Sequence, residues 1–291
     1  DKLEELLLKL DYKKNKGSYS HPTRKVLFVG DYIDRGPKIR ETLDIVKSMV
    51  ESDNAIALMG NHEYNAICFH FHNTRGGHLR EHSIKNIIQH CETIKQFQGK
   101  QKEYEDYLNW FKTLPLYYET GTFKAVHACW DNNSIEYLKN TLINGRLTDD
   151  LIYQSAKEGT ELNNAIEQTL KGKEMKMPEG IFFNDKDGTK RSEIRIKWWE
   201  DPTKMTYKSI SVEPIENLPE QSIKLSELKS LDYYRTDDKK VFFGHYWLKG
   251  EPSLYKDNIC CLDYSVAKDG KLVAYRLTEE NTLDEKNFVY V

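Results

Sequence analysis

The sequence predicts an α/β fold in which short polar motifs follow buried strands. An unbroken apolar run at residues 26–29, a helical pattern at 39–50 and a second apolar run at 55–58 support this expectation. Strand, helix and strand in this order form a βαβ unit, whose parallel strands end at the same edge of the sheet. Ligands bind beyond that edge in α/β proteins. The functional site is therefore expected where the strands end.

Composition and charge limit the kinds of partner. The chain has 291 residues, 38% of them apolar and 31% charged, which is enough for one large domain or two small ones. The 43 Lys and Arg residues against 46 Asp and Glu give a net charge of -3, so no general attraction to nucleic acid is expected. The longest apolar runs are shorter than the ~20 residues that span a bilayer. No membrane or nucleic-acid partner is therefore expected.

The five cysteines are an odd number and form no C-x-x-C pair. This pattern predicts free thiols, not disulfides or a zinc site. Free thiols are typical of reducing compartments, so we expect a cytoplasmic protein.

The chain opens with DKLEELLLKL, whose leucines recur at the spacing of an amphipathic helix. No capping segment precedes this helix. We therefore expect the sequence to begin inside a longer protein.

Two motifs follow the first two strands. The run at 26–29 is expected as a strand buried on both faces, and it leads into GDYIDRG at 30–36. After the helix at 39–50, the strand at 55–58 leads into GNHE at 60–63. Both motifs thus lie at the carboxyl ends of strands.

Two later strands are predicted at 122–126 and 241–243, and each is followed closely by a histidine. The runs at 259–262 and 272–277 flank an Asp-Gly pair, which predicts a closing antiparallel hairpin. The ends of the strands at 122–126 and 241–243 thus project His127 and His245.

The segment between the two histidines is less regular. Residues 134–172 have the pattern of two or three polar helices, and residues 181–196 predict a β-hairpin around Asp187-Gly188. No Gly/Ser-rich linker marks an independent domain. We expect residues 131–235 to form an insertion over the active-site face.

The strand ends carry Asp31, Asn61, His127 and His245. A carboxylate oxygen, an amide oxygen and two imidazole nitrogens suit a divalent ion such as Mn²⁺, Fe²⁺ or Zn²⁺. Each residue alone has a plain structural alternative, since Gly-Asp and Gly-Asn are common in turns and single histidines are usually packed or solvated. The two motifs together fix nine positions, which is too many for coincidence. These four side chains are predicted metal ligands.

GDYIDRG, GNHE, the HACW segment and FGHY together resemble the calcineurin-like metallophosphoesterases, in the branch of phosphoprotein phosphatases and diadenosine tetraphosphatases. The resemblance implies a single domain over residues 1–291, built as a four-layer α/β/β/α sandwich with a helical and hairpin insertion. It also implies two divalent metal ions, with Mn as first choice and Fe, Zn, Ni or Mg as alternatives. Asp31 would bridge the two ions, and Asn61, His127 and His245 would complete the second site.

The same resemblance implies three catalytic roles. His62 would be the general acid, Asp34 would hold His62, and Arg35 would bind the phosphoryl oxygens. A carboxylate beside the far ring nitrogen fixes the tautomer of a histidine, and a planar guanidinium meets two phosphate oxygens. Arg195, in the tryptophan-rich EIRIKWWED stretch, is a candidate second phosphate ligand. The alternative for Arg195 is an exposed strand residue beside core tryptophans.

The chain also departs from the family pattern. Family members carry an earlier strand that ends in Asp-x-His-Gly and supplies the remaining ligands of the first metal. This sequence has no Asp-x-His ahead of Gly30. We expect that the natural protein has a preceding segment; the other explanation is a degenerate, one-metal or inactive relative.

These observations predict a metal-dependent phosphoesterase that hydrolyses phosphomonoesters or nucleoside polyphosphates through metal-bound hydroxide. Its substrate would be a phosphorylated small molecule, a nucleotide or a phosphoprotein, and the choice between a serine/threonine phosphatase and a dinucleoside tetraphosphatase stays open. The alternative from another class is a non-catalytic phosphate-binding module that has lost the first metal site.

Aromatic residues and further histidines lie near the motifs. Tyr246 and Trp247 either stack on a nucleobase or belong to the core. The histidines that follow GNHE are expected on loops or helix surfaces, because only His62 belongs to a motif. They are His70, His72, His78, His82 and His90.

Overall fold

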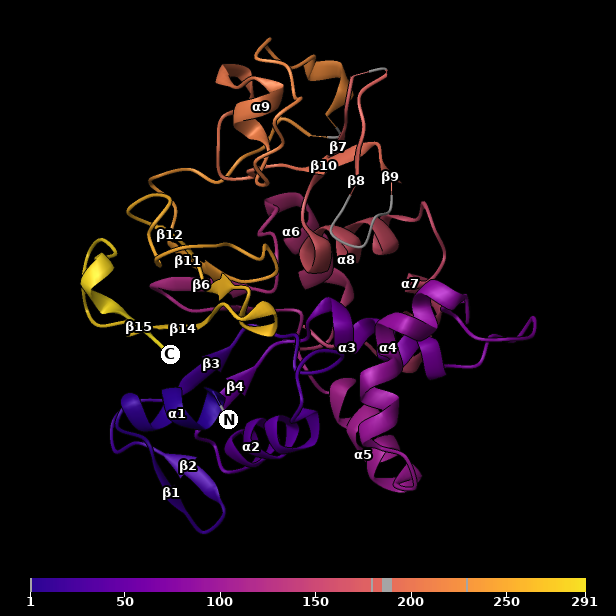
Figure 1. The fold of residues 1–291 in the computed structure, drawn as a ribbon, viewed down its shortest axis with the longest axis vertical. Helices are drawn as coiled ribbons and strands as arrows, with labels where there is room; N and C mark the ends of the chain where they lie inside the picture. Colours follow the sequence, from indigo (N-terminus) through magenta and orange to yellow (C-terminus); the bar gives the residue numbers. More distant parts are fainter. Residues whose placement is uncertain (1, 179, 185–189, 229) are drawn as a thin grey trace.

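Two groups of parallel strands lie at the centre of the structure, a computed structural model that describes residues 2–178, 180–184, 190–228 and 230–291. In the first group, β3 (Val26–Phe28) pairs in parallel with β4 (Ala55–Ala57), and α2 (Ile39–Glu51) connects them. Figure 1 shows this pair above α1 and α2. The predicted βαβ unit is therefore present, and the fold is mixed α/β.

The second group is a four-stranded sheet in the order β12, β11, β6, β5. Its strands are β5 (Tyr117–Glu119), β6 (Phe123–Val126), β11 (Lys240–Phe243) and β12 (Ile259–Cys261). β11 is parallel to both β6 and β12, whereas β5 is antiparallel to β6. The ladder continues past the strand ends, since the Gly244 N–H donates to the His127 carbonyl at 2.8 Å. The ends of β6 and β11, which lead to His127 and His245, therefore lie side by side.

Two strand predictions were wrong in detail. All three residues of β3 are half-buried, because within the described residues β3 pairs with β4 alone. The C-terminal hairpin also differs, since β12 joins the parallel sheet instead. An antiparallel sheet forms from β13 (Asp263–Tyr264), β14 (Lys271–Tyr275) and β15 (Phe288–Tyr290). The apolar β12 is fully buried and therefore belongs in the covered sheet, whereas β14 is mostly half-buried.

Three helices follow β6, and they are α6 (Asn132–Thr141), α7 (Asp149–Ser155) and α8 (Glu161–Lys171). Four short strands follow in antiparallel pairs, β7 (Glu174–Lys176) with β10 (Glu193–Arg195) and β8 (Phe183–Asn184) with β9 (Lys190–Arg191). The predicted turn at Asp187-Gly188 lies outside the described residues. In Figure 1 these strands and α9 (Tyr207–Ile210) lie at the end of the molecule away from α1 and α2.

Residues 175–223 contain a small hydrophobic cluster that is separate from the main core. Its buried members are Met175, Met177, Ile194, Ile196, Tyr207, Ile210, Leu218 and Ile223. A much larger cluster joins α2, the helices α6, α7 and α8, and the sheet strands β6 and β11. The main core therefore lies between the helices and the strands that carry the motifs.

The remaining elements complete the described chain. They are α1 (Lys2–Lys9), β1 (Lys13–Asn15), β2 (Ser18–Ser20), α3 (Asn61–His70), α4 (Ile84–Gln96), α5 (Gln101–Phe111) and the 3₁₀ turns η1 (Pro202–Lys204), η2 (Leu225–Glu227), η3 (Val266–Lys268) and η4 (Glu285–Asn287). Among the described helices, none has both the length and the apolar character that crossing a membrane requires.

Candidate functional site

The four predicted metal ligands meet where the two groups of strands end. The Nε2 atom of His127 lies 3.1 Å from Oδ1 of Asn61 and 3.4 Å from Oδ1 of Asp31. Nδ1 of His245 lies 2.8 Å from the same Asn61 oxygen. The candidate ligand atoms of Asp31, His127 and His245 all lie within 4.8 Å of one another. The structure thus brings all four side chains together.

The donor set fits a cation. The Nδ1–H of His127 donates to the Val29 carbonyl at 2.6 Å, which leaves Nε2 as an acceptor. That lone pair faces two oxygens, from Asp31 and Asn61, which are acceptors as well. Nε2 of His245 is buried without a hydrogen-bond partner among the described residues. Converging lone pairs repel one another unless a positive charge lies between them, and a divalent ion supplies that charge.

The initial glycines of both motifs allow the two loops to touch. Gly30 has φ +101°, and a Cβ atom there would lie 2.6 Å from the Gly60 nitrogen and 2.8 Å from Nδ1 of His127. A Cβ at Gly60 would lie 2.8 Å from Oε2 of Glu63. Such distances leave no room for a side chain at either position. The repeated glycine thus reflects close backbone approach at the site.

Gly30→Ala is expected to lower the free energy of unfolding by about 2–5 kcal/mol, because it adds both a backbone penalty and a clash. Gly36→Ala is the matched control, since Gly36 also has positive φ (+80°) but a Cβ atom there would have no neighbour within 4 Å. The control is expected to cost only about 1–2 kcal/mol. Urea denaturation followed by circular dichroism measures both. Equal losses would show that the close approach is unimportant.

Glu63 joins the two loops, a role that the sequence did not reveal. Its Oε2 accepts hydrogen bonds from the backbone N–H groups of Asp31 and Gly60, both at 2.9 Å. Its Oε1 accepts one from the Tyr32 N–H at 2.7 Å. Burial and the charge of Asp31 raise the pKa of Glu63 to about 7. The final residue of GNHE therefore fixes the backbone of the first motif.

Several site residues have left-handed backbone conformations. The φ angles are +64° for Asp31, +70° for Asp34, +73° for His245 and +54° for Trp247. Asp and His tolerate this region better than most residues, whereas a bulky tryptophan there is an outlier. Such conformations persist where the surrounding structure enforces them and cluster at functional sites.

The buried pair of His62 and Asp34 lies beside the converging donors, since the His62 backbone N–H donates to Oδ1 of Asp31 at 3.2 Å. The Nδ1–H of His62 donates to Oδ2 of Asp34 at 2.7 Å, and both residues are 6% exposed. Burial opposes the charge of His62, but Asp31 and the hydrogen-bonded Asp34 outweigh it and raise the pKa of His62 to about 9. The imidazole can therefore carry a proton at neutral pH.

His90 contradicts the expectation of a helix-surface residue. It is 4% exposed, and its Nδ1–H donates to Oδ1 of Asp34 at 2.6 Å. The Tyr104 hydroxyl donates to Nε2 of His90 at 2.7 Å, and the Thr93 hydroxyl donates to the same Asp34 oxygen at 2.7 Å. Burial would raise the pKa of Asp34, but the hydrogen bonds from His62 and His90 lower it to about 2. Asp34 thus stays ionised and holds His62.

His90→Ala is expected to lower kcat by about 10- to 100-fold with little change in KM, because Asp34 loses one of the donors that orient it. His90→Asn keeps a short side-chain N–H that can reach Asp34 and should recover most of the loss. Steady-state kinetics of the two variants separate positioning from general damage. If the asparagine and alanine variants were equally impaired, the hydrogen bond to Asp34 would not be the cause.

The two arginines predicted to bind phosphate have different surroundings. Arg35 is exposed, and its guanidinium carbon lies 5.3 Å from the ring centroid of Trp247. Arg195 is 31% exposed in its side chain and lies 3.8 Å from Glu213 in an ion pair. Burial, followed by the positive charge of Arg195, holds the pKa of His245 well below its ordinary value. Arg195 is therefore close enough to influence the donor group.

The other aromatic and histidine residues near the motifs differ in how deeply they are buried. Tyr246 is 2% exposed and contacts Phe243 and Trp199, so it belongs to the core. Trp247 is half-buried. His72 and His82 are exposed, as expected for a loop.

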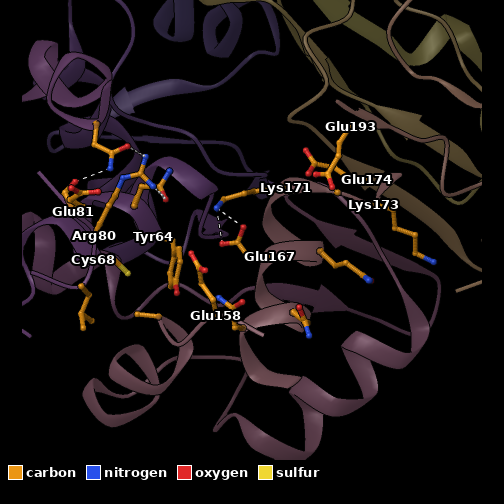
Figure 2. Close-up of a pocket in the computed structure, with 18 of the residues that line it drawn as sticks. Tyr64, Cys68, Arg80, Glu81, Glu158, Glu167, Lys171, Lys173, Glu174 and Glu193 are labelled. Atoms are coloured by element: carbon orange, nitrogen blue, oxygen red, sulfur yellow. Dashed lines mark hydrogen bonds and ion pairs between the residues drawn. The ribbon is translucent and has the colours of Figure 1, made fainter. Parts of the chain in front are cut away.

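A pocket of about 800 Å³ lies beside α3. Figure 2 shows Tyr64, Cys68 and Arg80 on one side and Glu167 with Lys171 on the other. The charged groups are largely satisfied, since Arg80 donates to Asn65 at 2.8 Å and Lys171 pairs with Glu167. None of the four converging donors lines this pocket. It neighbours the site without containing it.

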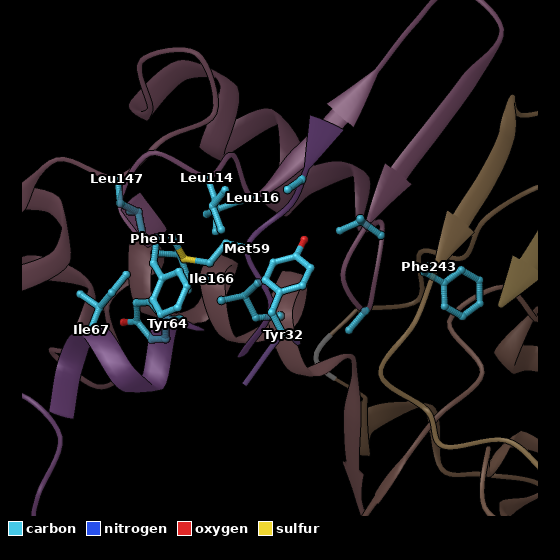
Figure 3. Close-up of a cluster of buried hydrophobic side chains, with 14 of the residues drawn as sticks. Tyr32, Met59, Tyr64, Ile67, Phe111, Leu114, Leu116, Leu147, Ile166 and Phe243 are labelled. Carbon is cyan, nitrogen blue, oxygen red and sulfur yellow. The ribbon is translucent and has the colours of Figure 1, made fainter. Parts of the chain in front are cut away.

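Hydrophobic packing holds α3 in place beneath the site. Nine of its ten residues are buried, and they include the polar Asn61 and His62. Figure 3 shows Tyr64 and Ile67 of this helix together with Phe111 and other core side chains. A helix that is buried on nearly all sides has little freedom to move. The first turn of α3 therefore presents its polar residues in fixed positions.

Comparison with known proteins adds to this geometry. A family model described as calcineurin-like phosphoesterase matches residues 1–246. The chain is 46% identical over 63 residues to a bis(5'-nucleosyl)-tetraphosphatase PrpE [asymmetrical] of Halalkalibacterium halodurans, covering 21% of this chain and 26% of that protein. It is 22% identical over 279 residues to a symmetrical bis(5'-nucleosyl)-tetraphosphatase of Neisseria meningitidis, covering 91% and 86%. The match to the Halalkalibacterium protein thus spans about a quarter of its length.

Proposed function

Because the chain belongs to the calcineurin-like phosphoesterase family, we propose that it is a hydrolase that cleaves phosphoester or phosphoanhydride bonds with the help of a bound divalent cation. The observation that carries this proposal is the convergence of Asp31, Asn61, His127 and His245 at one point. Dinucleoside polyphosphates are the first substrates to consider, because the relatives are named as bis(5'-nucleosyl)-tetraphosphatases. Phosphomonoesters and phosphoproteins come next.

These four residues would hold one ion, with Mn²⁺ as first choice. A divalent cation at such a site polarises a phosphoryl oxygen and lowers the pKa of water. A second ion would share Asp31 and would require further donors, which the family pattern places in an Asp-x-His motif. The sequence contains no such motif ahead of Gly30. The number of bound metal equivalents in elemental analysis distinguishes one ion from two.

His62 and Asp34 would together protonate the leaving group. Water adds its oxygen to phosphorus and releases a proton to the solvent, from which His62 can regain the proton it donates, and the bond from phosphorus to the leaving oxygen breaks. His62, held by Asp34 through its Nδ1–H, would donate the proton on its other nitrogen to that leaving oxygen. Arg35 and Arg195 would orient the phosphoryl oxygens through charge-assisted hydrogen bonds. The products are a phosphate and the protonated leaving group.

The alternative is a module that binds phosphate without hydrolysing it. Such a module needs cationic side chains but no proton donor. The buried hydrogen bond between His62 and Asp34, at 2.7 Å, is an arrangement suited to proton transfer. The relatives are also named as enzymes. These observations favour the hydrolase.

Three finer features belong to the same proposal. The four-layer sandwich and the single-domain organisation with an insertion at 131–235 follow from the family resemblance. A cytoplasmic location is supported by the absence of disulfides among the five cysteines, all of which are free.

A substrate panel tests the proposed function. The metal-stripped protein is reloaded with Mn²⁺ and assayed on diadenosine tetraphosphate, p-nitrophenyl phosphate and a phosphoserine peptide, with the chelated protein as control. We expect metal-dependent release of product from at least one of them, and one or two metal equivalents by elemental analysis. Phosphate binding without turnover of any substrate would instead support the non-catalytic module.

A further inference from the structure

Two cationic side chains contact one tryptophan beside the candidate metal centre. The guanidinium carbon of Arg35 and Nζ of Lys268 each lie 5.3 Å from the ring centroid of Trp247. The two charges are thus at most twice that distance apart. Within the described part of the chain, neither side chain forms an ion pair or donates a hydrogen bond. We call Arg35, Trp247 and Lys268 the cation shelf.

The cation shelf borders the metal ligands. Trp247 follows His245 by two residues, and Arg35 follows Asp31 by four. Two segments of the cation shelf therefore also carry two of the converging donors, Asp31 and His245. Lys268 comes from a separate segment, the 3₁₀ turn η3, so three distant parts of the chain meet here.

Hydrogen bonds fix the two loops that carry Trp247 and Lys268. The Trp247 N–H donates to Oδ2 of Asp263 at 3.0 Å, and the Leu248 N–H donates to the Asp263 carbonyl at 2.9 Å. The Ser265 hydroxyl donates to the Leu248 carbonyl at 3.0 Å. These bonds hold Trp247 in its left-handed conformation and place η3 beside it. The backbone segments that carry Trp247 and Lys268 are therefore held next to each other.

Unpaired cations at a fixed site are suited to an anionic ligand. The contact with the indole stabilises each cation only weakly and leaves its charge available, because the ring carries no net charge. A single phosphoryl group can be bound by the metal donors and Arg35. Lys268 then has no counterpart in a phosphomonoester, whereas a polyphosphate offers further charged groups next to the one that reacts.

We propose that the cation shelf binds the phosphoryl groups adjacent to the one being hydrolysed, so that the site selects polyphosphates over phosphomonoesters. This inference rests on the proposed function and specifies its substrate class. The Lys268 ammonium binds the second phosphoryl group through its positive charge. Trp247 contacts both Lys268 and Arg35 and keeps the two side chains close to each other. A nucleobase stacked on Trp247 would compete with the two cations for the same ring.

The test compares inorganic tripolyphosphate, diadenosine tetraphosphate and p-nitrophenyl phosphate with the Mn²⁺-loaded protein. Lys268→Ala is expected to raise KM about 10-fold for both polyphosphates relative to p-nitrophenyl phosphate, equivalent to one lost charge contact. Lys268→Arg, which keeps the charge, should restore most of the preference. Lys249→Ala is the matched control, since Lys249 is exposed in the same loop as Trp247 and should change the ratio less than about 2-fold.

Each contrary outcome is informative. An equal rise in KM for all three substrates would indicate a general electrostatic effect and would overturn the proposal. A loss confined to diadenosine tetraphosphate would indicate nucleobase stacking, which also overturns it. If the unaltered protein hydrolyses none of the three, the proposed function fails. In that case, calorimetry measures the affinity of the same variants for tripolyphosphate. Equal affinity of Lys268→Ala and the unaltered protein would show that the cation shelf does not bind the adjacent phosphoryl group.

Discussion

Asp31→Asn is expected to weaken metal binding by more than about 100-fold and to reduce hydrolysis by at least as much. The carboxylate is the only full negative charge among the four converging donors, so its loss removes most of the attraction for a cation. Asparagine is nearly isosteric and tolerates the left-handed φ of +64°, so the backbone should not change. Elemental analysis after dialysis and initial rates with Mn²⁺ measure the two effects.

Asp53→Asn is the matched control. Asp53 also has a left-handed backbone, with φ +57°, but it is exposed and pairs with Lys25 on the surface. This variant should bind metal and turn over substrate like the unaltered protein. Full metal content and activity in Asp31→Asn would show that the four donors are not a metal site.

His62→Gln is expected to lower turnover by about 10²- to 10⁴-fold while the metal content stays unchanged. The glutamine side chain can still contact Asp34 but cannot transfer a proton. The loss should be largest for substrates with a poor leaving group, such as an alkyl phosphate, and smaller for p-nitrophenyl phosphate, whose leaving group needs less protonation. Steady-state kinetics with both substrates provide the measurement.

The pH dependence gives an independent check on His62. Asp31 and Asp34 raise its pKa, so the proton-carrying form is complete below that pKa and is lost as pH rises through it. A cation bound to Asp31 would offset part of this attraction and move the alkaline loss of activity to lower pH. His62→Gln should lack this alkaline limb, whereas His82→Gln, at an exposed position, should retain it. A preserved limb in His62→Gln, or an equal rate loss on both substrates, would contradict the acid role.

The strand ends could be predicted because their determinants are local. Short apolar runs and the glycines that follow them indicate where β3, β4, β6 and β11 end. Parallel strands in an α/β fold end at one edge, so the donors that follow them are expected near one another. The parallel pairing of β6 with β11 agrees with this expectation.

His90 could not be predicted because the pattern of α4 is misleading. Ile84 is 78% exposed and Ile88 is 69% exposed, whereas His90 is 4% exposed and Thr93 is fully buried. A helix pattern read from hydrophobicity alone places the isoleucines inward. The polar face of α4 is instead buried, because His90 and Thr93 form hydrogen bonds to Asp34. Asp34 lies in a loop more than fifty residues away in the sequence, so the pattern of α4 does not reveal these bonds.

The sequence by itself determined which side chains the candidate site offers: the order of carboxylate, amide and imidazole donors, the glycines of the two motifs, and His62 with Asp34. The tertiary structure alone decided which further residues face that chemistry, namely Glu63 between the loops, His90 behind Asp34 and Lys268 beside Trp247. The physical reason is the separation along the sequence of the residues that interact. Donor type and strand ends depend on neighbouring residues, whereas contacts between distant segments depend on how whole elements pack.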